Sequence, residues 1–95
     1  MEEIKLNQER LNKICYILGS YDYDSLYLNS NDAHVWLMIG NRDNYIPKFA
    51  LDEISEFMGD NWGVCRLDVD LGLLFERESP DEVLTIPDGL GAYDE

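Results

Sequence analysis

The first apolar pattern along the chain has the period of a helix. Apolar residues recur at positions i, i+3, i+4 and i+7, which places one stripe on one side of a helix: Leu11, Ile14, Cys15 and Leu18. Asn7 precedes this stripe and is a favourable N-cap residue, because its side chain can accept a hydrogen bond from the first turn. Gly19 follows the stripe and favours helix termination. We therefore predict a helix over residues 8–18.

Two short apolar stretches follow, separated by turn-forming residues. Residues 25–28 and 34–39 have the composition of strands, and the second stretch holds the longest apolar run of the chain. Residues 29–32, between them, are a dense cluster of Asn, Ser and Asp. This order predicts a β-hairpin with a loop of about four or five residues. The alternating Tyr and Asp of residues 21–25 leave two alternatives open, an extended edge or a loop, and residues 40–44 are predicted to form another loop.

A second helical pattern begins at Pro47, where a missing N–H group costs little. Its apolar positions share one face of the predicted helix: Ala50, Ile54, Phe57 and Met58. The opposite face carries three acids: Asp52, Glu53 and Glu56. Gly59 is the expected end of this helix, and residues 59–63 are expected to form a turn.

The clearest strand pattern lies between residues 65 and 71. Apolar and charged side chains alternate there, with Cys65, Leu67, Val69 and Leu71 on one face and Arg66, Asp68 and Asp70 on the other. One charged face predicts a sheet that is covered on one side only. Gly72 is expected to form a bulge or a turn, after which residues 73–75 extend this strand or pair with it. Residues 83–86 are predicted to form a last edge strand, and residues 88–95 a loose tail.

The predicted elements occur in the order α-β-β-α-β-(β), without a repeat or a linker. A chain of 95 residues is long enough for one domain and too short for two. We therefore predict a single α+β domain over residues 1–95. Its mainly antiparallel sheet of about three to five strands carries two helices on one face.

Charge is the most unusual property of the chain. Twenty Asp and Glu residues face seven Lys and Arg residues, which gives a formal net charge of −13. This sign argues against direct binding to nucleic acid or to an anionic membrane, because both are negatively charged. Two interpretations remain open: a surface that only increases solubility or suits an acidic or saline host, and a surface that binds a basic partner.

The apolar runs also bear on location and on the state of the cysteines. Residues 1–6 do not form the long apolar run of a signal peptide, and no stretch approaches the roughly 18 apolar residues of a membrane span. We therefore expect a cytoplasmic protein, located in the host cytoplasm if a phage encodes it. Cys15 and Cys65 are then expected to be buried, reduced thiols, and a disulfide between them is the alternative.

Residue types that carry most enzymatic chemistry are scarce. The single histidine, His34, lies at the edge of an apolar strand and is expected to have a structural role. It forms no compact zinc-ligand spacing with the two cysteines, and no glycine-rich phosphate loop is present. The pairs Asp22/Asp24 and Asp68/Asp70 resemble the start of a calcium loop, but the following ligands and glycine are missing or misplaced. We therefore expect no catalytic residue, no metal, no cofactor and no enzymatic activity.

The abundant carboxylates are the remaining candidates for function. Asp68 and Asp70 are expected on one face of one strand, roughly 6.5–7 Å apart at the strand rise. Regularly spaced carboxylates on rigid elements can imitate a phosphate backbone, and a tyrosine among them adds contact area. The predicted partner-binding residues are Asp22, Tyr23, Asp24, Asp52, Glu53, Glu56, Asp68 and Asp70.

Such a set of residues predicts a small acidic inhibitor that binds another protein. The expected partner is a basic nucleic-acid-binding protein, such as a nuclease or a CRISPR or restriction effector, whose nucleic-acid channel the acids occupy. Small acidic inhibitors of this kind are known from phages and mobile elements, and the analogy is one of size and charge. The alternatives are an immunity or antitoxin protein that neutralises a nuclease toxin, a structural or adaptor subunit, and a small enzyme with a pair of catalytic carboxylates.

Overall fold

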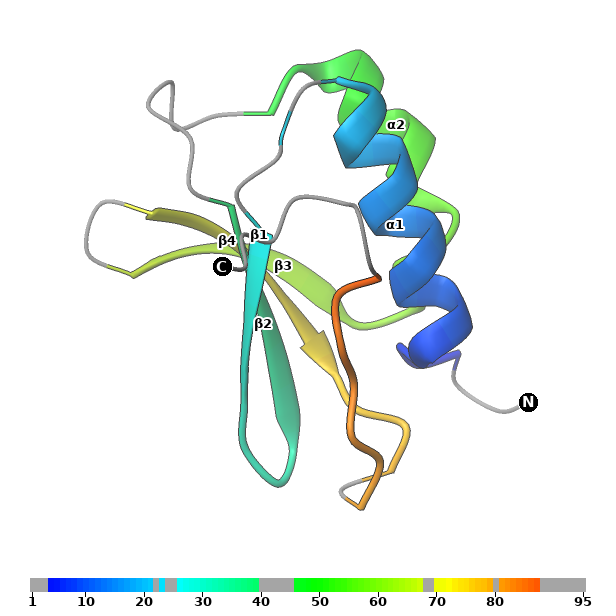
Figure 1. Cartoon of the computed structure of the whole chain (residues 1–95), viewed down its shortest axis with the longest axis vertical. Coiled ribbons are helices and arrows are strands. Elements are labelled where there is room, and N and C mark those ends of the chain that lie inside the picture. The colour runs from blue at the N-terminus through cyan, green and yellow to red at the C-terminus, as the bar shows by residue number, and fades with distance from the viewer. Residues whose placement is uncertain are drawn as a thin grey trace.

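The computed structural model describes residues 4–21, 23, 26–39, 46–67, 70–79 and 81–87, with Leu67 and Asp70 described by their backbone alone (Figure 1). The described residues form two helices and four strands in the order α-β-β-α-β-β, so the predicted α+β fold is confirmed. The elements are α1 (Gln8–Ser20), β1 (Leu26–Ser30), β2 (His34–Ile39), α2 (Lys48–Ser55), β3 (Trp62–Leu67) and β4 (Asp70–Glu76).

The four strands form one antiparallel sheet in the order β1-β2-β4-β3. Two hairpins, β1–β2 and β3–β4, are joined by the pairing of β2 with β4 at the centre of the sheet. Both helices lie on the same side of the sheet (Figure 1), and the core lies between that face and the helices. The predicted arrangement of two helices on one face is therefore confirmed, and no described helix covers the other face.

Helix α1 begins where the sequence predicts and ends two residues later. The Asn7 side chain accepts a hydrogen bond from the backbone N–H of Arg10 at 2.9 Å, so Asn7 is the N-cap. The predicted apolar stripe is fully buried: Leu11, Ile14, Cys15 and Leu18. Gly19 does not end the helix, because the N–H of Tyr21 still bonds to carbonyl groups of the last turn. The helix therefore continues through Ser20.

The β1–β2 hairpin has a shorter loop than the sequence predicts. β2 has the predicted bounds, whereas β1 continues two residues beyond its predicted end, to Ser30. Asn31 explains the difference, because its side-chain oxygen accepts hydrogen bonds from the backbone N–H groups of Ala33 and His34, both at 2.8 Å. An Asn side chain used in this way replaces part of the backbone hydrogen bonding of a turn. Residues 31–33 are therefore sufficient to reverse the chain.

Helix α2 starts after Pro47, as predicted, but is shorter than predicted. It ends at Ser55, and turns connect it to Gly59, which has a positive φ of 84°. A Cβ atom at this glycine would lie 2.5 Å from the carbonyl oxygen of Ile4. Gly59 is therefore required both by its backbone conformation and by the close approach of the N-terminal segment. The buried residues of α2 include two of the predicted apolar positions, Ala50 and Ile54.

The single strand predicted over residues 65–71 is in fact two strands. β3 ends at Leu67 and β4 begins at Asp70, and these two residues pair across an antiparallel hairpin. The alternation of apolar and charged residues did not reveal this reversal, because both strands of a hairpin have the same period of two. Trp62 and Gly63, which were predicted to lie in a turn, belong to β3.

Gly72 lies inside β4, and not in a bulge or a turn as predicted. It pairs with Met38 on β2 and with Cys65 on β3. A Cβ atom at Gly72 would lie 2.8 Å from the Met38 Sδ and 3.1 Å from the Cys65 Sγ. The absent side chain therefore makes room for two sulfur-containing side chains on the face of the sheet opposite the helices.

The segment after β4 has no strand pairing at residues 83–86, so the predicted edge strand is wrong. Gln8 of α1 binds this segment instead: its amide donates to the Thr85 carbonyl at 2.8 Å and accepts from the Thr85 N–H at 3.0 Å. Leu84 and Ile86 pack against the core. Side-chain contacts with α1 thus replace the hydrogen bonds of a strand.

Some predictions concern residues outside the described part of the chain. These are the loop at residues 40–44, the tail at residues 88–95 and most of the alternating stretch at residues 21–25. Within the described part, neither helix combines the length and the apolar composition that crossing a membrane requires.

Candidate partner-binding surface

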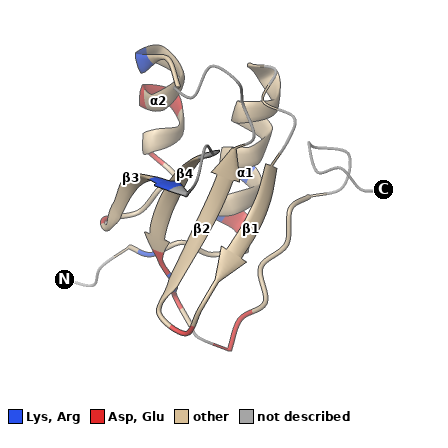
Figure 2. Cartoon of the chain, turned by 90° about the vertical axis from the view of Figure 1, so that its left-hand side faces the viewer, with Lys and Arg blue, Asp and Glu red and all other residues tan. Residues whose placement is uncertain are grey.

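The described charged residues lie at the surface of the protein. No polar or charged residue is buried in the described part of the chain. Figure 2 shows acidic residues on the helices, at the strand ends and in the segment after β4. Even if each of the seven Lys and Arg residues paired with one acid, thirteen of the twenty carboxylates would have no basic partner within the chain. Among the described residues, the negative charge therefore lies at the surface and not in a buried network.

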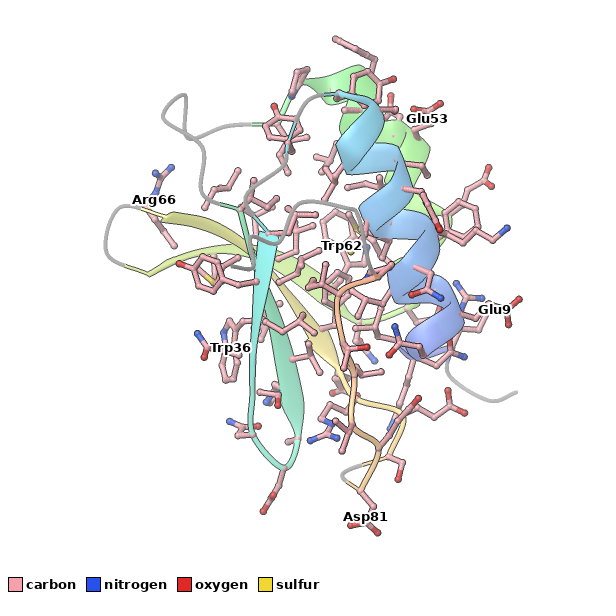
Figure 3. All side chains as sticks on the ribbon, viewed as in Figure 1. Glu9, Trp36, Glu53, Trp62, Arg66 and Asp81 are labelled. Carbon is pink, nitrogen blue, oxygen red and sulfur yellow. The ribbon has the colours of Figure 1, made fainter. Side chains whose placement is uncertain are left out.

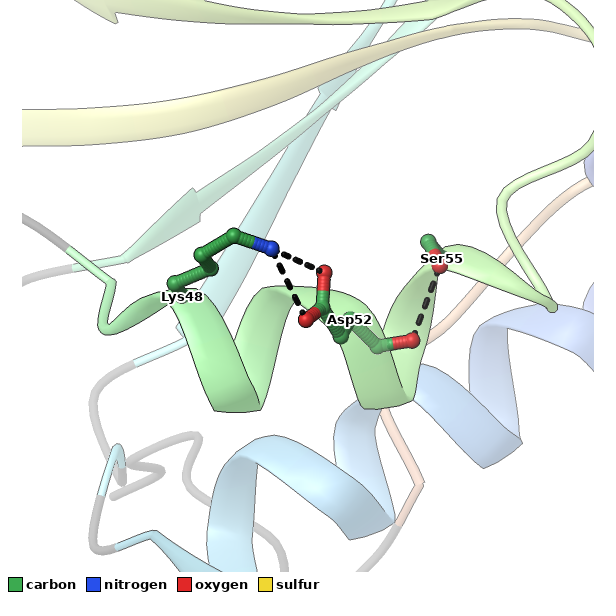
Figure 4. Close-up of polar contacts among 3 residues, drawn as sticks. All are labelled: Lys48, Asp52 and Ser55. Atoms are coloured by element: carbon green, nitrogen blue, oxygen red, sulfur yellow. Dashed lines mark hydrogen bonds and ion pairs between the residues drawn. The ribbon is translucent and has the colours of Figure 1, made fainter.

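Helix α2 and its C-cap residue Glu56 provide three predicted contact residues, all of which are exposed. The Lys48 Nζ lies 3.1 and 3.4 Å from the two carboxylate oxygens of Asp52 (Figure 4). Both side chains are exposed, so this i,i+4 pair adds little stability and leaves Asp52 accessible. Glu53 accepts a hydrogen bond from the Tyr21 hydroxyl at 2.8 Å, which raises the pKa of Tyr21. Glu56 is exposed, and its carboxylate has no hydrogen-bond or ion-pair partner among the described residues.

The other predicted contact residues are either buried or outside the described part of the chain. Tyr23 is 9% exposed and packs in the core, so the contact area predicted for its ring is not available. Asp22, Asp24 and Asp68 lie outside the described residues, and Asp70 is described by its backbone alone. Because β3 ends before Asp68 and β4 begins at Asp70, the prediction that both acids share one face of one strand is wrong.

A second group of acids, which is not among the predicted contact residues, lies at one end of the sheet (Figure 2). We call it the end cluster, and it consists of Asp32, Glu76, Glu78, Asp81 and Glu82. Its members come from the β1–β2 loop, from the end of β4 and from the chain that follows. Four of these acids lie within residues 76–82, but no local pattern predicts that the acid of the β1–β2 loop joins them.

Arg77 joins the segments of the end cluster through hydrogen bonds to backbone carbonyls. Its guanidinium group donates to the carbonyl oxygen of Asn31 at 2.8 Å and to that of Glu82. Its backbone N–H donates to the Ala33 carbonyl at 3.1 Å. These bonds connect the β1–β2 loop to the chain after β4, so the fold itself places the neighbouring acids together.

The end cluster keeps most of its charge exposed. The Glu76 Oε1 lies 3.8 Å from the Lys5 Nζ, near the limit of an ion pair, and both side chains are partly exposed. Asp32 and Asp81 are exposed, and within the described part neither carboxylate accepts a hydrogen bond. The cluster therefore offers carboxylates to a partner with little competition from within the chain.

A hollow of about 300 Å³ lies beside β3 and shares Glu76 with the end cluster. We call it the Gly63 hollow; it is lined by His34, Asp60, Asn61, Trp62, Gly63, Leu74, Phe75 and Glu76. A Cβ atom at Gly63 would have no atom within 4 Å, so the absent side chain leaves this space open. Asp60 is fixed beside it, because its Oδ2 accepts a hydrogen bond from the Ile4 N–H at 2.9 Å. Two carboxylates at an open hollow suit the positively charged side chain of an Arg or a Lys.

The pKa values of the two thiols do not favour nucleophilic chemistry. Cys15 and Cys65 are both free, so the alternative of a disulfide between them is wrong. Burial raises the pKa of Cys15 to about 12 and also raises the pKa of Cys65. Since the thiolate is the reactive form, both thiols are poorly reactive at neutral pH. Cys65 is half-buried, not fully buried as predicted.

The face of the sheet opposite the helices is partly apolar. The strand register places aromatic, sulfur-containing and aliphatic side chains there: Tyr27, Trp36, Met38, Cys65 and Leu74. Figure 3 shows Trp36 on the side of the sheet away from α1, whereas Trp62 lies between the sheet and α1. Tyr27 is 44% exposed. This face therefore combines aromatic rings with the Gly63 hollow at its edge.

The described geometry yields two exposed groups of acids, on α2 and in the end cluster, and one acidic hollow. Among the described residues there is no group of three or more side chains that could hold a metal ion. Comparison with known protein families, with curated proteins and with solved structures finds no match. Charge and shape are therefore the properties from which a function can be inferred.

Proposed function

We propose that this protein binds a basic protein that handles nucleic acid and inhibits it by occupying its nucleic-acid-binding surface. A nuclease or a CRISPR or restriction effector is the expected partner. The observation that carries this proposal is the surplus of thirteen carboxylates over basic residues, on a chain whose described charges all lie at the surface. A basic channel built for a phosphate backbone attracts such a surface, because binding releases the counterions that both would otherwise retain.

The gathering of the acids supports partner binding over a general effect on solubility. Like charges placed together on a folded surface destabilise the fold, whereas solubility is served equally well by charges that are spread out. The end cluster nevertheless carries five acids on segments that Arg77 joins, and the guanidinium group of Arg77 bonds to backbone carbonyl oxygens of these segments. We infer that this arrangement serves the recognition of positive charge.

Mutual exclusion is the simplest route to inhibition. Nucleic acid and this protein would compete for the same Lys and Arg side chains of the partner, so no catalytic residue of the partner needs to be contacted. Electrostatic attraction also speeds the encounter, to association rate constants of up to about 10⁸–10⁹ M⁻¹ s⁻¹ at low salt. We therefore expect both the association rate and the affinity to fall as the salt concentration rises.

A pull-down from host lysate at low and at high salt, with mass spectrometry of the captured proteins, tests the proposal. We expect capture of a basic nucleic-acid-handling protein at low salt, its release at high salt, and its displacement by added nucleic acid. Absence of such a protein at both salt concentrations would overturn the proposal. A partner that holds this protein and its nucleic acid at the same time would overturn the mechanism of mutual exclusion.

Single charge removals then locate the contact. Asp81→Asn changes the end cluster, and Glu56→Gln changes α2. Glu9→Gln is the matched control, because it removes the same charge from an exposed position on α1 outside both groups. We expect either contact variant to weaken binding several-fold more than the control. Equal effects of all three substitutions would mean that only the net charge matters.

The face of the sheet opposite the helices favours a second candidate, a structural or adaptor role. Its exposed Tyr27 and its Trp36 are residue types that interfaces prefer. This role predicts capture that is insensitive to salt and is abolished by Trp36→Ser. An immunity or antitoxin role uses the same acids as the proposed function, and the identity of the captured protein, a nuclease toxin, distinguishes it.

A further inference from the structure

β3 is an outer strand whose free side is open in the described part of the chain. The order β1-β2-β4-β3 places β1 and β3 at the two edges of the sheet. The edge at β1 is flanked by the chain after β4: Leu28 and Ser30 line a small cavity together with Val83 and Leu84, and Figure 2 shows this segment running beside β1. No described segment pairs with the outer side of β3.

The hydrogen bonds of the β3–β4 hairpin identify the backbone groups of β3 that point outwards. The Glu76 N–H donates to the Asn61 carbonyl oxygen at 3.4 Å, and hydrogen-bonded positions alternate along an antiparallel pair. Gly63, two positions after Asn61, therefore bonds to β4. The N–H and C=O groups of Trp62 and Val64 point away from β4, where an added strand would bond to them.

This edge lacks most of the features that prevent strand addition. Natural proteins protect edge strands with Pro, Lys, bulges or a covering segment. β3 contains neither Pro nor Lys and pairs with β4 at every position from Trp62 to Leu67, without a bulge. Its Val64 side chain is 56% exposed. The first half of β3 is therefore a regular template with an apolar side chain at its margin.

The Gly63 hollow lies along the same edge. The side chains of an added strand would alternate between the two faces of the sheet. On the face opposite the helices, such a side chain would lie beside Gly63, where no Cβ atom fills the space. A long cationic side chain could cross that space and reach the carboxylates of Asp60 and Glu76, which line the hollow.

We propose that an extended, basic segment of the partner protein adds to β3 as a further strand and places an Arg or Lys side chain in the Gly63 hollow. The expectation that this segment is basic rests on the proposed function. Strand addition is the way in which this protein would recognise the partner. A second copy of this chain fits the edge poorly, because each copy carries a net charge of −13. Backbone pairing supplies affinity, and the hollow selects positive charge.

Amide hydrogen exchange of the whole protein, followed residue by residue by NMR, tests the proposal directly. The probe is a short peptide that alternates Arg and Val, and the matched control peptide alternates Glu and Val. We expect the Arg-Val peptide to slow exchange at Trp62 and Val64 by about tenfold or more, and the Glu-Val peptide to leave it unchanged. Equal protection by both peptides, or binding that leaves these two amides unprotected, would overturn the proposal.

Substitution of Val64 tests the edge. Val64→Pro removes an outward N–H group and none of the bonds to β4, so the hairpin is retained while the added strand loses a hydrogen bond. We expect the affinity for the Arg-Val peptide to fall about fivefold or more. Val64→Thr keeps the N–H group and is the matched control, for which we expect an unchanged affinity. Equal affinities of the two variants would refute pairing at this edge.

Substitution of Gly63 tests the hollow and does not depend on the folding of the proline variant. Gly63→Leu fills the hollow, and its Cβ atom meets no other atom within 4 Å. We expect this variant to lose the preference for the Arg-Val peptide over a peptide that alternates Thr and Val. An unchanged preference would show that the cationic side chain binds elsewhere, which contradicts the proposal.

The outcomes also separate this proposal from the proposed function. A captured partner that is sensitive to salt and to Asp81→Asn but not to Val64→Pro would refute strand addition and leave the proposed function intact. Protection of Trp62 and Val64 by the Arg-Val peptide, without any basic nucleic-acid-handling partner in the lysate, would refute the proposed function and support the strand site. Protection of the same amides by self-association at rising protein concentration would identify a second copy as the occupant and overturn the proposal.

Discussion

Replacing Gly59 by Ala tests how the N-terminal segment is joined to the rest of the fold. Gly59 has a φ of 84°, a region that costs an L residue roughly 1–2 kcal/mol. The new Cβ atom would lie 2.5 Å from the Ile4 carbonyl oxygen, so Ile4 has to move. That carbonyl accepts the Asp60 N–H at 2.7 Å, and the Ile4 N–H donates to the Asp60 carboxylate at 2.9 Å. Moving Ile4 therefore weakens two hydrogen bonds.

The expected loss of stability follows from these contacts. Each hydrogen bond contributes about 0.5–1.5 kcal/mol, so the two bonds and the backbone conformation together amount to about 2–5 kcal/mol. In a domain of this size, such a loss lowers the Tm by at least about 8 °C. Gly63→Ala is the matched control, because its Cβ atom meets nothing within 4 Å. We expect that substitution to leave stability unchanged or to raise it by about 0.4–1 kcal/mol.

Thermal and denaturant unfolding, followed by circular dichroism, compares the two variants with the parent protein. The reasoning requires Gly59→Ala to be clearly less stable than Gly63→Ala. Equal midpoints would contradict both the positive φ of Gly59 and the packing of Ile4 against it. A large loss at Gly63 would show that the hollow beside β3 is filled in solution, which would also contradict strand addition there.

Two further predictions concern α1. Asn7→Ala removes the N-cap and should lower the free energy of unfolding by about 1 kcal/mol, most of which Asn7→Ser should restore; a loss near zero in denaturant titrations would argue against the cap. Burial raises the pKa of Cys15 from 9.0 to about 12, so above pH 9 the unfolded chain releases a proton that the folded chain retains. The contribution of this thiol to the free energy of unfolding is fully present below pH 9. Above pH 9 the free energy of unfolding should fall by up to about 1.4 kcal/mol per pH unit. Unfolding measured against pH should lose this slope in Cys15→Ala, and an identical slope in both proteins would contradict the assignment.

Local patterns predict those elements whose boundaries are encoded in neighbouring residues. The cap at Asn7 and the apolar stripe define α1, and the apolar run from His34 to Ile39 defines β2. The β3–β4 hairpin escaped prediction, because alternation with a period of two continues across the reversal between Leu67 and Asp70. The missed reversal also misplaced the acids that were assigned to that strand.

The candidate surface was predictable only where it depends on one element. The amphipathic pattern of α2 correctly places Asp52, Glu53 and Glu56 towards solvent. The end cluster instead depends on hydrogen bonds from Arg77 to residues before β2 and after β4, and no local pattern encodes contacts between such distant segments. Tyr23 illustrates a related difficulty, because alternating Tyr and Asp does not determine which side chain is buried.

The pairing of Gln8 with Thr85 constrains the order of events during synthesis. These residues are 77 positions apart, so the start of α1 leaves the ribosome long before the segment that binds it. A helix of 13 residues is marginal on its own, and contacts across so long a loop form slowly. The Ile4–Asp60 and Arg77–Asn31 bonds also join distant segments. The contacts of α1 with the segment after β4 therefore form only after Thr85 has been synthesised, and the end cluster is complete only once the chain beyond β4 has been made.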